Sequence, residues 1–376
     1  MIENPLVYLL TLSILASGFY FLEEKSKHKV FTFLPSVVMI YAFSMFLAST
    51  ELFAQNDAIH DIYKLAKTNL LPAMLFLILL QVDLKDFVKL GCKLLIAYLL
   101  AVVSIAVGFM AVVYLFGFDE TIASSFGALA GSWMGGTANM VAVGSALGVS
   151  EDAFAYALVV DSVNYTIWVA FLLFLTPFAT YFNRWSKADD SVVTMNGIGC
   201  SCTVGAKRYW FLVLLAIVVS FVTQLLATQF TILNSTTTIV LLATLFGIFG
   251  SFTKLREVGG SSEIATTMLY ILVALIGSQA VIESFWSVGL YVLAGFLILA
   301  IHFVLMALGA KLFKLDLFSI AVASLSNIGG VASAPILAAT YDKKLVGVGV
   351  LMAIMGYIIG TFGGLFVGNI LVGMAQ

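Results

Sequence analysis

Long uncharged apolar runs dominate the chain. Residues 30–50 contain no charged side chain, and the run 93–117 carries only the lysine at its first position. An apolar run of about 20 residues is typical of a membrane-spanning helix. Transmembrane β-strands instead alternate polar and apolar positions over about ten residues, and the chain shows no such alternation. The pattern therefore predicts an all-α polytopic membrane protein.

The apolar segments form two groups of six, separated by a polar stretch at residues 183–207. We expect residues 1–182 to form a first repeat, residues 183–207 a cytoplasmic linker and residues 208–376 a second repeat. The third segment is short and has Pro72 near its start, which favours a helix inside the bundle. The predicted segments are residues 5–22, 30–50, 68–83, 93–117, 121–148, 152–182, 208–229, 236–252, 264–282, 288–310, 317–341 and 345–372.

The two groups resemble each other at matching positions. A shift of 194 positions superimposes the second group on the first from the third segment onward. The shift places the stretch SWMGGTANM, which begins at Ser132, on SNIGGVASA, which begins at Ser326. Internal duplication is common among transporter folds, so we predict two structural repeats.

The distribution of charge predicts that the repeats have opposite orientations. Basic residues concentrate on the cytoplasmic side of membrane proteins. If segments 121–148 and 317–341 enter and leave the membrane on one side, ten helices cross, and every Lys and Arg except Lys64 and Lys67 lies inside. We therefore predict two inverted repeats of five transmembrane helices, each with one re-entrant or broken hairpin, and both termini outside.

Two pairs of adjacent glycines interrupt the predicted hairpin segments, Gly135–Gly136 in the first and Gly329–Gly330 in the second. Each glycine costs about 1 kcal/mol of helix stability, but it permits a tight reversal of the chain. Non-helical backbone at membrane depth is tolerated only where it is buried in protein or lines a watery cavity. Glycine-broken segments at matching positions of two halves indicate a transport site, and a purely structural reversal is the alternative.

Polar side chains beside the glycines extend the predicted substrate site. Ser, Thr and Asn offer neutral oxygens and donors that suit a polar solute, although each can also bond to nearby backbone. Asn139 and Asn327 are the strongest candidates, because an amide is costly to bury without partners. We expect Pro335 to start the second arm of its hairpin. The predicted substrate-binding residues are Ser132, Gly135, Gly136, Thr137, Asn139, Ser326, Asn327, Gly329, Gly330 and Ser333.

A row of small residues in the last segment predicts close helix packing. Gly356, Gly360, Gly364 and Gly368 recur every four residues and therefore lie on one helix face. Such spacing allows two helix backbones to approach closely in lipid. We expect this row to seat one of the hairpins.

Asp161 is the clearest charged residue inside a predicted span. A carboxylate in mid-membrane costs about 2.5–3.5 kcal/mol on insertion scales, so it needs an ion, a proton or a hydrogen-bond network. Its counterpart after the shift of 194 is Met355, so it lies outside the duplicated pattern. We predict a sodium site formed by Asp161, Asn164 and Asn139, with a packing acid as the alternative. His302 is expected to be a satisfied packing residue, with proton coupling as its alternative.

Composition narrows the remaining functional classes. The chain is 62% hydrophobic and 10% charged, whereas about 25% of the residues of soluble domains are charged. The chain contains no phosphate-binding loop, catalytic triad or pair of carboxylates, so we expect neither an enzyme nor a nucleic-acid-binding protein. We also expect no cofactor other than a coupling ion. Cys200 and Cys202 have no further ligand nearby in the sequence, which argues against a zinc site.

Two stretches carry a resemblance to a known family. They are GSWMGGTANMVAVGSALGVSEDAFAYALVVDSVNY and SNIGGVASAPILAATYDKKLVGVGVLMAIMGYIIGTFGGLFVGNIL. With almost the whole chain, they resemble a bacterial membrane-protein family of unknown function, the YjcL-like proteins. That family is similar to a superfamily of cation:proton antiporters, bile acid:sodium symporters and sodium–glutamate and citrate symporters. The resemblance implies an inverted-repeat fold with a scaffold domain, a core domain that moves like an elevator, and a homodimer in the bacterial cytoplasmic membrane.

These observations predict an ion-coupled secondary transporter of a small polar or anionic organic solute, working by alternating access. Sodium is favoured as the coupling ion because the polar inventory is rich in neutral oxygens and poor in titratable groups. A cation:proton antiporter using Asp161 is an alternative, although the paired acids of electrogenic antiporters are absent around it. A non-transporting membrane sensor or scaffold is the alternative from another class.

Overall fold

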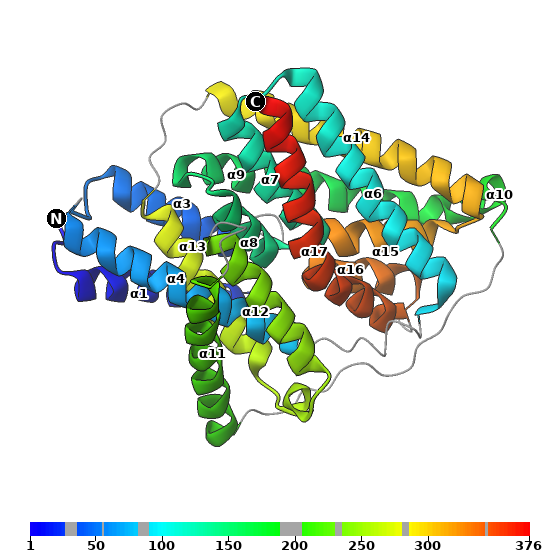
Figure 1. The fold of residues 1–376 in the computed structure, drawn as a ribbon. Coiled ribbons are helices and arrows are strands. Elements are labelled where there is room, and N and C mark those ends of the chain that lie inside the picture. The colour runs from blue at the N-terminus through cyan, green and yellow to red at the C-terminus, as the bar shows by residue number, and fades with distance from the viewer. Residues whose placement is uncertain are drawn as a thin grey trace. The chain divides into compact units, whose positions relative to one another are not determined.

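The computed structural model describes residues 1–26, 36–54, 56–81, 90–188, 205–229, 235–279, 286–342 and 345–376. These residues are helical apart from loops and one isolated bridge between Ile2 and Phe53, so the predicted all-α class is confirmed (Figure 1). Residues 189–204 of the predicted linker, with Cys200 and Cys202, lie outside the described residues.

Seven helices of the described residues are long and apolar enough to cross a membrane, judged by length and composition. Three further segments that we expect to cross form shorter apolar helices, namely α3 (Ser36–Ser49), α12 (Ser235–Ser251) and α13 (Ser261–Gly277). The number of crossings therefore stays a prediction. The seven long spans are Pro5–Glu23, Asp57–Leu80, Gly91–Phe116, Glu151–Ser186, Ala206–Ala227, Val288–Phe313 and Val346–Ala375.

The chain folds into two compact units, and each unit takes residues from both halves of the sequence. The first unit comprises Met1–Gln81, Val149–Ser162 and Cys202–Gly289. The second unit comprises Val82–Gly148, Val163–Ser201 and Leu290–Gln376. The predicted repeats stay a prediction. Most matching segments fall in the same unit, but Val149–Ser162 belongs to the first unit whereas its counterpart, residues 343–356, belongs to the second.

The first unit is built around α4 (Asp57–Leu80), whose second half is buried from Leu71 to Leu80. Its other helices are α1 (Pro5–Ser26), α3, α11 (Ala206–Ala227), α12 and α13. The helix α12 approaches α4 closely, since a Cβ atom added to Gly247 would lie 2.6 Å from the Cβ of Leu79. The start of α9 (Glu151–Leu175) completes this unit.

The third predicted segment was placed wrongly at its start. The helix α4 begins at Asp57 rather than near residue 68, and Pro72 lies inside it. The Asn56 side chain caps the helix by accepting a hydrogen bond from the Ile59 amide at 2.9 Å. The first turns of α4 are polar, so a hydropathy pattern finds only the apolar second half.

An ion pair joins α4 to the start of α9. The Lys67 ammonium lies 3.2 Å from a carboxylate oxygen of Glu151, and Tyr63 donates a hydrogen bond of 2.5 Å to the same oxygen. Tyr41 on α3 donates to the backbone carbonyl of Glu151 at 2.7 Å. Lys67 is one of two basic residues that the predicted topology places outside, and its partner Glu151 is acidic and predicted on that same side.

The second unit contains two helical hairpins. The first consists of α7 (Glu120–Gly135) and α8 (Thr137–Leu147), and the second of α15 (Leu317–Ile328) and α16 (Gly330–Tyr341). The arms of each hairpin run antiparallel. In the first, a Cβ atom on Gly131 would lie 2.9 Å from Val143, and one on Gly127 would lie 2.7 Å from Leu147. In the second, the rings of Phe318 and Tyr341, at the two open ends, are 5.3 Å apart.

Pro335 does not start the second arm, contrary to our expectation. The helix α16 begins at Gly330, and Pro335 lies inside it. The chain reverses at Gly330, which has a φ of +62°. Pro335 therefore removes an N–H group within the helix rather than at its first position.

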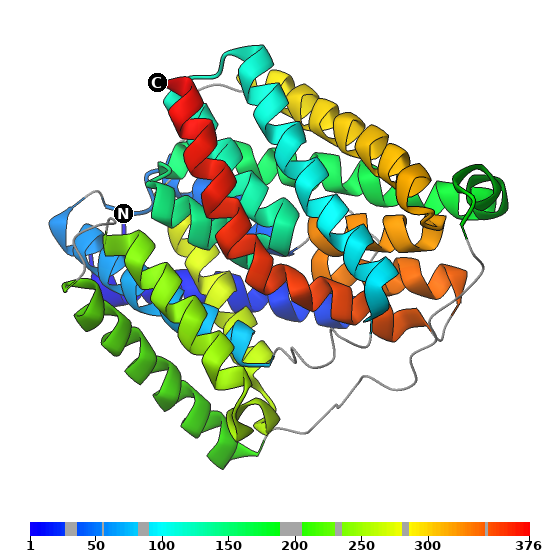
Figure 2. The same ribbon diagram turned by 45° about the vertical axis from the view of Figure 1, so that its right-hand side comes forward.

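The glycine row on α17 (Val346–Ala375) packs against α7, as predicted. A Cβ atom on Gly360 would lie 2.7 Å from the Cα of Gly135, and one on Gly364 would lie 2.6 Å from the Cα of Gly131. These approaches leave no room for a side chain. Both ribbon views show α17 running beside α6 (Gly91–Phe116) in the same unit (Figures 1 and 2).

Candidate functional site

The first hairpin tip carries the predicted pair Gly135 and Gly136, and the two glycines have different roles. A Cβ atom on Gly135 would collide with the amide nitrogen of Asn139 and with the carbonyl oxygen of Gly356. Gly136 has open space around it, but its φ of +88° lies in the region that side-chain-bearing residues rarely adopt. The first glycine therefore permits close packing and the second permits the reversal.

The second hairpin tip divides the two roles in the same way. A Cβ atom on Gly329 would collide with the hydroxyl of Ser333 and would lie 2.7 Å from the ring of Tyr165 on α9. Gly330 again has open space and a positive φ. The shared order of roles agrees with the sequence relation between the two motifs.

The helices that form the hairpins begin differently. The first arms α7 and α15 start with side-chain caps, since Asp119 and Asp316 accept hydrogen bonds from backbone amides at 2.9 and 2.8 Å. The second arms α8 and α16 start at the tips without a side-chain cap. The first N–H groups of a helix have no partner within it and attract negative groups. Both tips can therefore contribute backbone donors to an anionic group.

The Asn139 side chain is committed to contacts within the protein. Its amide nitrogen donates to the carbonyl oxygens of Gly135 and Gly356 at 2.8 and 3.2 Å. Its amide oxygen accepts a hydrogen bond from Thr361 on α17 at 2.6 Å. These bonds fasten the first hairpin tip to α17. Asn139 therefore serves packing in this structure, and its amide nitrogen could donate to a substrate only if one of its two bonds broke.

The second tip contains buried polar atoms without hydrogen-bond partners among the described residues. The hydroxyl groups of Ser326 and Ser333 and the amide oxygen of Asn327 are buried and have no hydrogen-bond partner among the residues that the structure describes. The amide nitrogen of Asn327 donates to the Ala323 carbonyl at 2.9 Å. A buried polar group without a partner costs about 1–3 kcal/mol. Three such groups near one hairpin tip are therefore a candidate site for a ligand that supplies the missing partners.

The remaining predicted site residues belong to α7, α8 and α9. Ser132 is buried on α7, and Thr137 is half-buried at the first position of α8. Asn164 is buried and its amide donates to the Val292 carbonyl on α14 (Trp286–Phe313) at 3.3 Å. Asp161 is half-buried and belongs to the first unit, whereas Asn139 and Asn164 belong to the second. The sodium site therefore stays a prediction.

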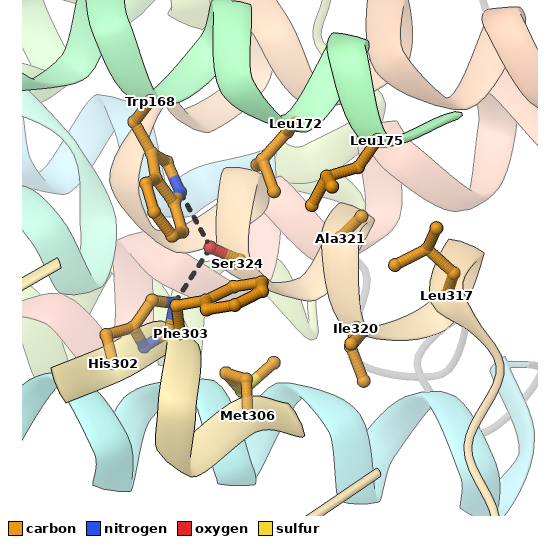
Figure 3. A pocket seen from close by; sticks show the side chains of 10 residues that line it. All are labelled: Trp168, Leu172, Leu175, His302, Phe303, Met306, Leu317, Ile320, Ala321 and Ser324. Atoms are coloured by element: carbon orange, nitrogen blue, oxygen red, sulfur yellow. Dashed lines mark hydrogen bonds between the residues drawn. The ribbon is translucent and has the colours of Figure 1, made fainter. Parts of the chain in front are cut away.

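A buried chain of hydrogen bonds that we did not predict joins the second hairpin to three other helices. Figure 3 shows the bonds of Ser324 to Trp168 and His302. The Trp168 indole donates to Ser324 at 2.9 Å, and Ser324 lies 2.8 Å from Nε2 of His302. The Nδ1 atom of His302 lies 2.7 Å from the hydroxyl of Ser104, which donates to the Ala101 carbonyl. Because the Ser104 proton is used, Nδ1 carries the imidazole proton and Nε2 accepts from Ser324.

These hydrogen bonds confirm the expectation that His302 is a packing residue with its hydrogen-bonding groups satisfied. The side chain is fully buried, and both ring nitrogens are hydrogen-bonded. These hydrogen-bonded residues border a small pocket. Its walls are otherwise apolar, so the pocket does not suit a polar solute. The lining residues are Trp168, Leu172, Leu175, His302, Phe303, Met306, Leu317, Ile320, Ala321 and Ser324.

The comparisons with known proteins agree with a membrane protein of unknown activity. A model of the family described as "Protein of unknown function (DUF819)" matches residues 10–374. The chain is also similar to the uncharacterized membrane protein YjcL of Bacillus subtilis (strain 168). The two are 23% identical over 340 residues, which cover 82% of this chain and 83% of the relative. The chain is therefore a multi-pass membrane protein with a bacterial homologue.

Proposed function

The chain belongs to the DUF819 family, and we propose that it is a sodium-coupled secondary active transporter of a small polar or anionic organic solute. The observation that carries the proposal is the pair of glycine-tipped hairpins in one compact unit. The second tip adds buried polar atoms of Ser326, Asn327 and Ser333 that have no partner among the described residues. Non-helical backbone within the bilayer is tolerated where it is buried in protein or lines a watery cavity, and paired breaks of this kind in two chain halves favour a binding site.

The division into units supports an alternating-access mechanism of the elevator type. In this mechanism the first unit is a static scaffold that forms the homodimer, and the second unit is the core that carries the solute. Each unit combines residues from both chain halves, and the two hairpins lie together in the second unit, which favours two interleaved repeats. We place the protein in the bacterial cytoplasmic membrane with both termini outside, as the distribution of basic residues favours.

Sodium is the coupling ion that suits the available oxygens. The atoms at the second tip that have no partner among the described residues are an amide oxygen and two hydroxyl groups, which are neutral ligands suited to a hard monovalent cation. Asp161, on the long apolar helix α9, is a separate candidate for an interaction with sodium. Proton coupling instead would use the carboxylate itself.

Ligand-dependent thermal stability tests the proposal. Purified full-length protein is heated in sodium chloride and in choline chloride, with each of a panel of small metabolites. A ligand that binds only the folded state stabilises it by about 2.7 kcal/mol when the free ligand concentration is 100 times the Kd. The unfolding temperature therefore rises. We expect stabilisation by one solute class, and only with sodium.

Two variants locate the effect. Ser333→Ala removes a hydroxyl at the second tip, and it should weaken the response to solute. Ser49→Ala is the matched control in the first unit, because this serine bonds to its own helix at 2.9 Å. If both variants show equal solute-dependent shifts in unfolding temperature, the second tip is not part of the binding site. The absence of any sodium-dependent shift in the wild-type protein would contradict the proposal.

A further inference from the structure

Tyr98, on α6, has a buried hydroxyl group without a hydrogen-bond partner among the residues that the structure describes. Its side chain is 0% exposed. The hydroxyl lies 3.4 Å from the position of a Cβ atom added to Gly356, and that atom would lie 3.0 Å from the Cα of Gly135. The Tyr98 hydroxyl therefore lies beside the tip of the first hairpin.

The Asn139 amide, which bonds to the carbonyl of Gly356, does not satisfy this hydroxyl. Asn139 uses both amide hydrogens on the carbonyls of Gly135 and Gly356, and its oxygen accepts from Thr361. The tip is therefore closed by bonds in which Tyr98 has no part. The phenol remains available to a group that enters from outside the protein.

Packing alone does not account for a tyrosine at this position. Phenylalanine would fill the same space without burying a hydroxyl, which is costly when the group has no partner. The position that corresponds to Tyr98 after the shift of 194 is Val292, so the second half has no counterpart hydroxyl. The hydroxyl is therefore a feature of the first tip alone, and the sequence pattern gave no reason to single it out.

We propose that the Tyr98 hydroxyl donates a hydrogen bond to a carboxylate oxygen of the transported solute. This inference rests on the proposed function and names its substrate class, a small organic carboxylate. The fully buried polar side chains of the described residues include no Lys or Arg, so neutral donors must hold the anion. The uncapped start of α8 at the same tip adds the positive end of a helix dipole.

Equilibrium binding to the purified full-length protein tests the inference. The probes are radiolabelled lactate, pyruvate, malate, citrate and glutamate, measured in sodium buffer. Tyr98→Phe removes only the hydroxyl, and Tyr114→Phe is the control because it removes an exposed hydroxyl from the same helix. We expect Tyr98→Phe to raise the Kd of the bound carboxylate about tenfold or more, as the loss of a hydrogen bond to a charged group does. The control should keep the wild-type Kd.

The selectivity of the variants separates a ligand contact from a structural role. Wild-type protein should prefer the bound carboxylate to its primary amide, and Tyr98→Phe should lose part of that preference while unfolding at the same temperature or higher. Unchanged Kd and unchanged preference in Tyr98→Phe would overturn the inference while leaving the proposed function intact. Sodium-dependent binding of an uncharged solute, with no binding of any carboxylate, would also overturn it.

Discussion

The substitution Gly364→Ala tests whether the first hairpin is seated on a glycine face. The added methyl group would lie 2.6 Å from the Cα and 3.1 Å from the backbone nitrogen of Gly131, and 2.9 Å from Val143. Ordinary van der Waals contact begins at 3.4 Å. Two of the three neighbours are backbone atoms, which a change of rotamer cannot move, so α17 and α7 must separate.

The size of the effect follows from two opposing contributions. Overpacking of this kind typically costs about 1–3 kcal/mol, whereas alanine favours a helix over glycine by about 1 kcal/mol. The matched control is Gly373→Ala on the same helix, where an added Cβ atom meets nothing within 4 Å. The control therefore gains the helix contribution alone, and Gly364→Ala should be less stable than the control by about 1–3 kcal/mol.

Unfolding of both variants in detergent, followed by circular dichroism against temperature or denaturant, measures this difference. Gly364→Ala should also weaken any ligand response of the first tip, because α17 holds that tip through Asn139. Equal stability of Gly364→Ala and Gly373→Ala would show that α17 and α7 do not approach as closely as described, and the packing argument would fail.

Three further predictions concern the tip, the ion pair and the topology. Gly136→Ala should destabilise the protein by about 1–3 kcal/mol, since the φ of +88° and ψ of 174° at this position lie in a region that is essentially restricted to glycine; unfolding midpoints equal to wild type would contradict this backbone conformation. A double-mutant cycle with Lys67→Met and Glu151→Gln should give a coupling energy of about 0.2–1 kcal/mol, because the pair is partly exposed; zero coupling in low salt would show that the two side chains do not form a stabilising ion pair. Single cysteines placed at Asp119 and at Glu151 should both react with an impermeant reagent from outside, and labelling from opposite sides would exclude a re-entrant first hairpin.

Much of the hairpin architecture could be predicted from the sequence because it depends on local properties of glycine. Adjacent glycines permit a tight reversal of the chain, although Gly363 and Gly364 lie within the continuous helix α17. A four-residue glycine spacing exposes a flat face on any helix. The beginning of α4 was missed because its first turns are polar, and an apolar pattern cannot detect a helix end that lies beyond the apolar run. The structure shows that end through the Asn56 cap, whose side chain accepts a hydrogen bond from the Ile59 amide.

The chemistry of the tips was harder to predict, since it depends on partners far away in the sequence. Asn139 looked available for a ligand, yet Thr361 and Gly356 on the last helix satisfy its amide. Tyr98 looked like one apolar position among many, yet its hydroxyl is left without a partner among the described residues. Sequence spacing identifies residue types that can bind, whereas tertiary contacts decide which of their atoms remain free.

Sodium-driven uptake into proteoliposomes tests whether this protein is a sodium-coupled transporter of organic carboxylates. Purified wild-type protein and Asp161→Asn are reconstituted in parallel, and accumulation of radiolabelled carboxylates is followed under an inward sodium gradient, an inward proton gradient and no gradient. We expect accumulation by wild type under the sodium gradient alone, and none by Asp161→Asn. Accumulation driven by protons, or full sodium-driven accumulation by Asp161→Asn, would contradict this expectation.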